Sequence, residues 1–382
     1  MIRSSLAVCS LAALTGTAAP VVTDLVVSQD PSRIVTVSYT LSEKAIVTME
    51  AFTNGVSIGF APIANATGDV NVRVDADRNR RILWDPTQTW PNRKIKDGSF
   101  SVRLTAWALD NPPDYMIVDL RSGDLRWYPS AEAVPGGITS DAYKTEKLAM
   151  RHIRAAGVRW RMGNSFDETA NNTHDVILTN DYYIGVYKVT VSQHNAICGT
   201  SYSGGKNAIM GIAYRDMRGA SPTYDWPSKR HLVDPDSASG KLNRLTGLAF
   251  DLPTEAQWEF ACRGGTADNH IGFADVTDVA WSKESGVAAV QEVGLLQPNG
   301  FGLYDPLGNG FDFCLDWYTA DYNGVPKGGL AIEPEGPAGG DLRVIRNGSV
   351  KHAASCEHRE GFGETGVAST VGYRLACSTD MH

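Results

Sequence analysis

The stretch "DLPTEAQWEFACRGG", residues 251–265, predicts a short helix with a marked beginning and a marked end. Thr254 and Gln257 have the T-x-x-Q spacing of a capping box, in which each side chain satisfies a backbone N–H that the first turn leaves unpaired. Arg263 and the two glycines after it favour a left-handed end, with a cation near the negative pole of the helix. The apolar side chains that share one face are Trp258, Ala261 and Cys262. Such a helix packs on a core, and by itself it indicates no activity.

The length of the chain, 382 residues, predicts two domains rather than one. Charged residues make up 20% of the sequence and glycine occurs 38 times, which is typical of a globular protein rich in loops. The formal net charge is −8 and the sequence has no basic run. This charge argues against a nucleic-acid partner and against binding to an anionic membrane surface.

The first 19 residues predict a signal peptide, because Arg3 is followed by an apolar run and then by small residues. The run is too short for a stable membrane span, and no later segment reaches that length. We therefore expect an exported protein, either periplasmic, on the cell surface or secreted. Removal of the signal peptide would leave an odd number of cysteines, which allows one or two disulfides that the sequence does not assign. These cysteines are Cys198, Cys262, Cys314, Cys356 and Cys377.

Residues 20–119 predict an all-β sandwich of the immunoglobulin-like or fibronectin-like type. Apolar residues alternate with polar ones in several short segments that turn residues separate. In one segment the apolar positions are Val35, Val37, Tyr39 and Leu41. No titratable cluster occurs there, so we expect a spacer or adhesion role. Residues 120–145 are rich in proline, glycine and small residues, and we interpret them as a linker.

Residues 146–380 contain five motifs in a fixed order. They are "YYIGVYKVTVSQHNAIC" (182–198), "LPTEAQWEFACRGG" (252–265), "VGLLQPNGFGLYDPLGNGFDFCLDWY" (293–318), "RVIRNGSV" (343–350) and "VGYRLACS" (371–378). In order and spacing this set resembles the formylglycine-generating enzyme, or sulfatase-modifying factor, family. The resemblance implies an α+β domain with a C-type-lectin-like fold and little regular secondary structure. Asp251 stands where the family usually has arginine.

Catalytic members of this family convert a sulfatase cysteine to formylglycine and bind copper with two cysteines. The corresponding positions after Ser349 hold His352 and Glu357, and Cys356 falls one residue short of the second position. Since Cu(I) is held by two thiolates, we expect neither copper nor oxidase activity here. One alternative stays open, a divergent oxidase that acts on a protein cysteine. A zinc or copper cluster of His352, Cys356 and His358 is a less favoured alternative.

The segment "LGNGFDFCLDWY", residues 307–318, resembles the loop with which the family ligates calcium. The resemblance implies ligands at Asn309 and Asp312, together with the carbonyl oxygens of Leu307 and Gly310. Aspartate in place of the usual glutamate shortens the reach by one methylene. The alternative interpretation is a structural turn with Asn309 in the left-handed conformation.

Residues 347–371 depart most from the family and predict a ligand-binding face. The candidate contacts are Lys351, His352, Glu357 and His358. In the branch of this fold that retroelements diversify, the same segment is the variable surface, because flanking strands fix the frame while loop side chains point outward. Ordinary divergence accounts for the same residues. We expect a secreted or surface protein whose second domain binds an unknown protein or glycan, without catalysis.

Overall fold

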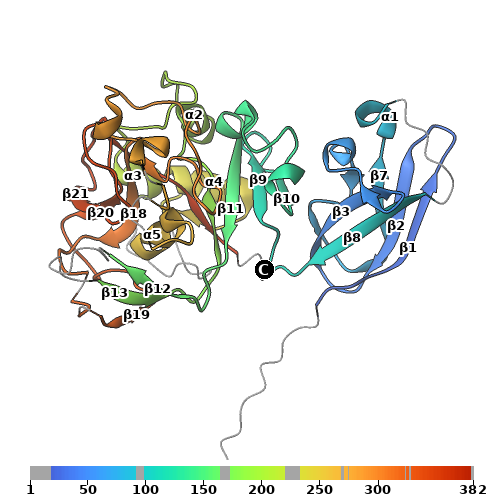
Figure 1. The fold of residues 1–382 in the computed structure, drawn as a ribbon, viewed down its shortest axis with the longest axis horizontal. Helices are drawn as coiled ribbons and strands as arrows, with labels where there is room; N and C mark the ends of the chain where they lie inside the picture. The colour runs from blue at the N-terminus through green and yellow to red at the C-terminus, as the bar shows by residue number, and fades with distance from the viewer. Residues whose placement is uncertain are drawn as a thin grey trace, which may run out of the picture.

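The computed structural model is described for most of the chain (Figure 1). The described residues are 19–91, 99–163, 173–219, 233–267, 271–273, 275–322, 324–326 and 328–379. Residues 1–18 lie outside this set, and they are all but the last residue of the predicted signal peptide, residues 1–19. Within it, the structure contains no helix with the length and apolar character needed to cross a membrane.

The N-terminal part forms two antiparallel sheets around one apolar core. One sheet has the strand order β1-β2-β7-β5, and in the other β3 pairs with β4, β6 and β8. Alternate residues of β2, from Val35 to Leu41, are at most 3% exposed, which confirms the predicted alternation. The elements are β1 (Val22–Gln29), β2 (Val35–Leu41), β3 (Ala45–Thr53), β4 (Val56–Ser57), η1 (Ala61–Ile63), β5 (Thr67–Gly68), β6 (Arg73–Val74), β7 (Asp77–Trp84), α1 (Pro86–Thr89) and β8 (Phe100–Trp107).

The second domain contains a six-stranded antiparallel sheet with the strand order β10-β9-β11-β14-β23-β15. Strand β23, close to the C-terminus, pairs with β14 and β15, so the last strand of the domain lies inside the sheet. The strands are β9 (Tyr115–Asp119), β10 (Leu125–Tyr128), β11 (Lys147–Ile153), β14 (Tyr182–Gly185), β15 (Phe250–Asp251) and β23 (Ala376–Ser378).

The domain boundaries that we expected differ from those of the structure. We placed residues 115–119 in the sandwich and residues 120–145 in a linker, but β9 pairs with β11 of the second domain and β10 pairs with β9. The two 3-10 helices that follow, η2 (Ala131–Ala133) and η3 (Asp141–Lys144), lead into the same domain, and Tyr143 is buried in its core. The physical reason is that alternation identifies a strand without identifying the sheet that it joins.

Smaller sheets and α-helices α2 to α5 complete the second domain as far as its residues are described. The strands β21-β20-β18-β22 form one sheet, β12-β13-β19 a second, and β16-β17 a third. The elements are β12 (Arg159–Met162), β13 (His174–Ile177), α2 (Val191–Cys198), α3 (Tyr214–Arg218), α4 (Ala238–Thr246), α5 (Glu255–Arg263), η4 (Val276–Asp278), β16 (Ala280–Trp281), η5 (Lys283–Ser285), β17 (Leu307–Gly308), β18 (Phe311–Trp317), β19 (Leu330–Ile332), β20 (Arg343–Arg346), β21 (Arg359–Phe362) and β22 (Val371–Gly372).

Helix α5 has both of the predicted ends. The hydroxyl of Thr254 accepts from the backbone N–H of Gln257 at 3.2 Å, and the backbone N–H of Thr254 donates to Gln257 Oε1 at 2.9 Å. Gly264 ends the helix with φ 60°. The helix packs against β18 and β20, which places it inside the domain. The buried apolar residues of the predicted face are Trp258, Ala261 and Cys262.

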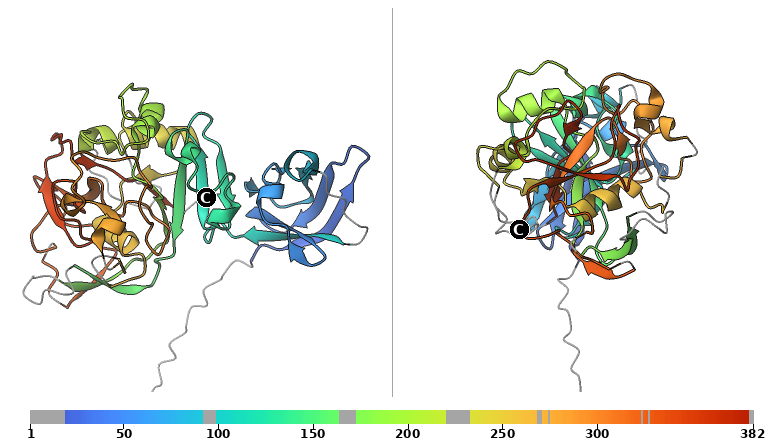
Figure 2. Two further views of the ribbon diagram at one scale, coloured as in Figure 1. Left: turned by 45° about the horizontal axis from the view of Figure 1, so that its top comes forward. Right: turned by 90° about the vertical axis from the view of Figure 1, so that its left-hand side faces the viewer.

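Strand β10 contacts the N-terminal part (Figure 2). The backbone N–H of Trp127 donates to the carbonyl of Asn71 at 2.9 Å, and the guanidinium of Arg73 lies 5.4 Å from the centre of the Trp127 ring. Trp127 is only 1% exposed. The hairpin β9–β10 therefore belongs to the second domain and carries its contact with the first.

The five cysteines that follow the predicted signal peptide are all free thiols in the structure. Four of them are buried, and Cys198 is partly exposed. The disulfides that the sequence allows are therefore not formed here.

A truncation series tests the revised boundary. A fragment that begins at residue 110 keeps β9 and β10 and should unfold cooperatively. A fragment that begins at residue 140 exposes the edge of β11 and the apolar residues beneath the lost hairpin, so it should aggregate or melt roughly 10 °C or more lower. Circular dichroism during heating measures both, and equal melting temperatures would contradict the placement of the hairpin in this domain.

Candidate functional site

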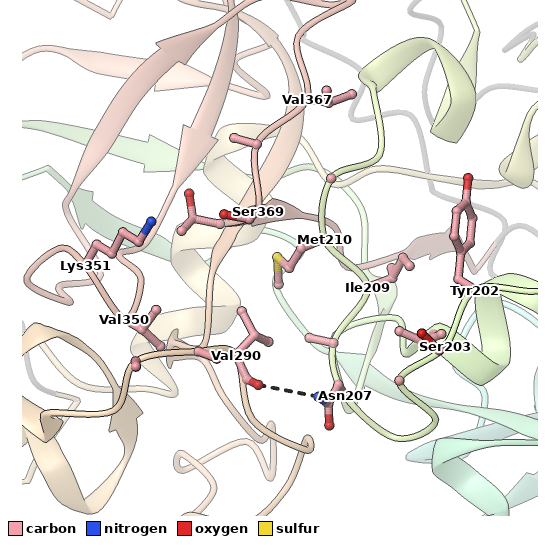
Figure 3. A pocket seen from close by; sticks show the side chains of 18 residues that line it. Tyr202, Ser203, Asn207, Ile209, Met210, Val290, Val350, Lys351, Val367 and Ser369 are labelled. Atoms are coloured by element: carbon pink, nitrogen blue, oxygen red, sulfur yellow. Dashed lines mark hydrogen bonds between the residues drawn. The ribbon is translucent and has the colours of Figure 1, made fainter.

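An open cavity of about 560 Å³ lies where the segment 347–371 returns to the body of the second domain (Figure 3). Three parts of the chain line it, namely the start of α2 with the region that follows the helix, a short stretch before β17, and both ends of the segment. The lining residues are Val191, 202–204, 207–211, 288–290, 350–351 and 367–370. A concave site of this size accommodates a small molecule or a few residues of a peptide.

The lining is mostly apolar, and Lys351 is the one charged residue among the lining positions that the structure describes. Figure 3 shows Met210 in the middle of the lining and Lys351 at one side. Tyr202 and Val367 are 52% and 64% exposed. Apolar side chains left exposed around a hollow are typical of a surface that binds a partner. The cavity therefore suits a ligand with an apolar body and a negatively charged group.

Two glycines allow the backbone to approach Met210 closely. A Cβ atom on Gly310, whose φ is 100°, would lie 2.4 Å from the Met210 methyl carbon. A Cβ atom on Gly372 would lie 2.1 Å from the carbonyl oxygen of Ile209. The carbonyl of Ile209 excludes a Cβ atom at Gly372, and the positive φ disfavours other residues at Gly310, so glycine at both positions lets the backbone lie directly behind the lining.

The four predicted ligand contacts do not converge on the cavity. Lys351 lines it, whereas the other three are not among its lining residues in the described chain. His352 is exposed and its Nδ1 lies 2.7 Å from Ser349 Oγ. The rings of His352 and His358 lie 5.2 and 5.7 Å from the ring of Phe311. The side chain of Glu357 is partly buried.

The residues of the segment do not fit the copper site of the family. His352 and Glu357 stand at the two thiolate positions, and Cys356 is fully buried. Burial raises the pKa of the Cys356 thiol to about 12. A cysteine buried in this way is inert toward partners in solvent. In the part of the chain that the structure describes, no group of three or more histidine, cysteine or acidic side chains is placed to hold a metal ion.

The two residues predicted to ligate calcium are engaged in other contacts. Asn309 has φ 53°, in the left-handed region that the alternative interpretation expected. Its side-chain oxygen accepts from the backbone N–H of Gln291 at 2.9 Å, and its amide nitrogen donates to the carbonyl of Gln291 at 3.2 Å. Asp312 Oδ2 lies 2.7 Å from the ammonium nitrogen of Lys188. With a lysine ammonium at the carboxylate, these residues do not fit a calcium ion.

A buried ionic network anchors the segment at its start. Arg346 donates to Glu255 Oε1 at 2.9 Å, to Glu259 Oε2, and to the carbonyl of Cys356 at 2.6 Å. Arg359 donates to both oxygens of Glu255 at 2.6 and 2.9 Å. Burial opposes the ionisation of Glu259, but the charges of Arg346 and Arg263 and the hydrogen bonds from Gly163 and Arg263 together outweigh it, so the pKa of Glu259 is lowered. The network joins α5, β20 and β21 to the backbone of the segment.

Sequence reasoning missed this network and two of the three parts that line the cavity. Glu255 and Glu259 were one available signal. Like charges at i and i+4 repel on a helix, so their presence on a helix that packs into a core indicates buried cationic partners. The stretches 207–211 and 288–290 carry no comparable signal, because small and apolar residues occur in any core.

Comparison with known proteins gives a consistent result. A family model described as "Sulfatase-modifying factor enzyme 1-like domain" matches residues 140–379. The formylglycine-generating enzyme of Thermomonospora curvata is 32% identical over 166 residues, which are 39% of this chain and 54% of the relative. The serine/threonine-protein kinase pkn1 of Chlamydia pneumoniae is 32% identical over 222 residues, which are 53% of this chain and 34% of the relative. The chain thus spans only about a third to a half of the length of these relatives.

Among solved structures, Treponema denticola variable protein 1 has a TM-score of 0.50 and is 24% identical. The match covers 61% of this chain and 95% of that one. At this identity the likeness shows the fold alone.

Replacing Arg346 tests the ionic network. Arg346→Met leaves the carboxylates of Glu255 and Glu259 buried with fewer cations, so the free energy of unfolding should fall by about 3–5 kcal/mol. Arg159→Met removes a guanidinium from a pair in which the arginine side chain is 62% exposed, and it should change the free energy by less than about 1 kcal/mol. Urea denaturation measures both, and equal effects would contradict the central role of Arg346.

Asp316 gives the network a dependence on pH. Burial and the charge of Glu255 raise its pKa from the ordinary 3.8 to about 7. The folded protein then keeps a proton that the unfolded chain releases, so the stability contributed by this group falls as pH rises from about 4 to about 7. In Asp316→Asn this part of the dependence should vanish. The free energy of unfolding of the wild type, relative to the variant, should therefore decrease across urea melts at pH 5, 6, 7 and 8, and a constant difference would contradict the raised pKa.

Proposed function

This chain belongs to the family of sulfatase-modifying factor enzyme 1-like domains, and from that premise we propose that its second domain binds a partner without catalysing the oxidation for which the family is named. The observation that carries the proposal is the state of Cys356. It is the one cysteine within residues 347–371, and its side chain is buried, with 0% of its surface exposed. Formylglycine generation as the family performs it needs two accessible thiolates, which this segment does not supply.

The lining of the cavity provides groups that could bind a ligand. Its lining offers methionine and valine side chains, which adapt to apolar surfaces, and one lysine for a carboxylate. We propose as ligand a short protein segment that presents apolar side chains and one acidic group, in preference to a glycan. The candidate contacts His352, Glu357 and His358 then lie outside the cavity and serve a larger partner that extends past it.

The rest of the chain suits a protein that works outside the cytoplasm. We propose that residues 1–19 direct export, on the pattern of a cation, an apolar run and small residues. The two sheets of the N-terminal part enclose one apolar core. We assign them the role of an immunoglobulin-like spacer. The contact of Trp127 with Asn71 and Arg73 would fix the binding domain at the end of that spacer.

A divergent oxidase is the second candidate, and the identity to the formylglycine-generating enzyme of Thermomonospora curvata favours it. Incubation with a cysteine-containing sulfatase peptide and added copper, followed by mass spectrometry, separates the two candidates. We expect no conversion of cysteine to the aldehyde. The Cys356→Ser variant is the matched control, and aldehyde formed by the wild type but not by this variant would overturn the binding proposal.

Selection from a displayed library of random peptides tests the proposed ligand class. Enriched peptides should combine apolar residues with an aspartate or a glutamate. Lys351→Glu should weaken their binding about tenfold or more, because one favourable charge contact becomes repulsive. Lys44→Glu makes the same change of charge in the N-terminal part, where the side chain is 54% exposed, and should leave the affinity within about twofold. Equal losses in both variants would show that only net charge matters.

A further inference from the structure

Lys188 is a buried cation that neither the cavity nor the ionic network uses. It lies between β14 and α2, and its side chain is 0% exposed. The ammonium nitrogen lies 2.7 Å from Asp312 Oδ2 and donates to the carbonyl of Gly310 at 2.9 Å. These are a carboxylate oxygen and a carbonyl oxygen from the loop in which the sequence predicts a calcium ion.

Three oxygens of this loop also accept from the side chains of Asn347 and Trp258. The amide of Asn347 donates to the carbonyl of Gly308 at 2.9 Å and to that of Gly310 at 3.3 Å. The indole of Trp258 donates to Asp312 Oδ2 at 3.0 Å. Calcium takes six to eight oxygen ligands, and the donors on these atoms occupy the space that the ion would need. Asp312 Oδ1 has no hydrogen-bond partner among the described residues, but a single oxygen is far from a calcium site.

The formal charges of the site point the same way. Lys188 and Arg374 are the cations, and Asp305 and Asp312 are the anions, with Arg374 Nε 3.8 Å from Asp312 Oδ2. All four side chains are buried, and the charges sum to zero. Burial lowers the pKa of Lys188, and the carboxylate of Asp312 opposes that shift. A calcium ion added to this set would leave two uncompensated positive charges away from water, which is costly.

We propose that the Lys188 ammonium is an internal cation that takes the place of calcium in the loop of residues 307–312. The lysine neutralises Asp312 and fixes the carbonyl of Gly310, which are two tasks that a bound ion would perform. Because Gly310 lies directly against Met210, the same contact supports the lining of the cavity. The domain therefore keeps its loop in shape at any calcium concentration, including in surroundings that contain strong chelators.

Thermal melting of the full chain tests this proposal directly. An ion that binds only the folded state raises the melting temperature by mass action. The wild-type protein should melt at the same temperature, within about 1 °C, in 10 mM calcium and in excess chelator. A rise with calcium in the wild type that Asp312→Asn abolishes would overturn the proposal, because it would show calcium bound at this carboxylate.

Variants of the pair test the lysine itself. Lys188→Met keeps the length of the side chain and removes the charge, so Asp312 stays buried without its partner and the melting temperature should fall by roughly 10 °C. Lys188→Met combined with Asp312→Asn removes both charges and should recover at least half of that loss. Lys206→Met, at a partly exposed lysine paired with Asp141 and Glu292, is the matched control and should shift the melting temperature by less than about 3 °C.

An equal shift in Lys188→Met and Lys206→Met would overturn the proposal, and so would a double variant that is no more stable than the single one. If Lys188→Met does not fold, the comparison of the wild type in calcium and in chelator still decides the question.

Discussion

The guanidinium of Arg346 is the contact on which the second domain depends. It pairs with Glu255 and Glu259 on one helix, and it also holds the carbonyl of Cys356. Removing one partner of such a buried group leaves an uncompensated charge. Strand β20, helix α5 and the backbone at Cys356 therefore stabilise one another. This constraint fixes the orientation of α5 and the point at which the segment 347–371 leaves the sheet.

The contact of Arg346 with the carbonyl of Cys356 and the pairing of β21 with β20 hold the first part of the segment, so its exposed side chains can change while its backbone path stays the same. Val371 and Gly372 hold its other end through the parallel pairing of β22 with β18. The buried ionic network and the sheet therefore fix the backbone of the segment, and the exposed side chains of the segment form the polar surface. His352 and Glu357 at the two thiolate positions change such a surface without removing the cavity beside it.

Two buried cationic side chains, Lys188 and Arg374, neutralise and hydrogen-bond groups that a bound metal ion could also stabilise. Lys188 neutralises Asp312, and Arg374 donates to the carbonyls of Gly185, Val186, Tyr304 and Asp305. A domain with little regular secondary structure leaves many carbonyl oxygens without a partner, and long cationic side chains satisfy several at once. This accounts for the burial of Lys188 and Arg374 in the second domain.

The sequence by itself determined helix α5, the alternating strand β2 and the family of the second domain, because these depend on hydrogen bonds and apolar spacing within a few residues, or on motifs in a fixed order. It did not place β9 and β10, since a strand pattern carries no information about its partner sheet. Only the tertiary structure decided that Lys188 meets Gly310 across 122 residues, and that Lys351 and Met210 line one cavity. Such contacts depend on how distant segments pack, and no local pattern encodes which distant charge fills a buried site.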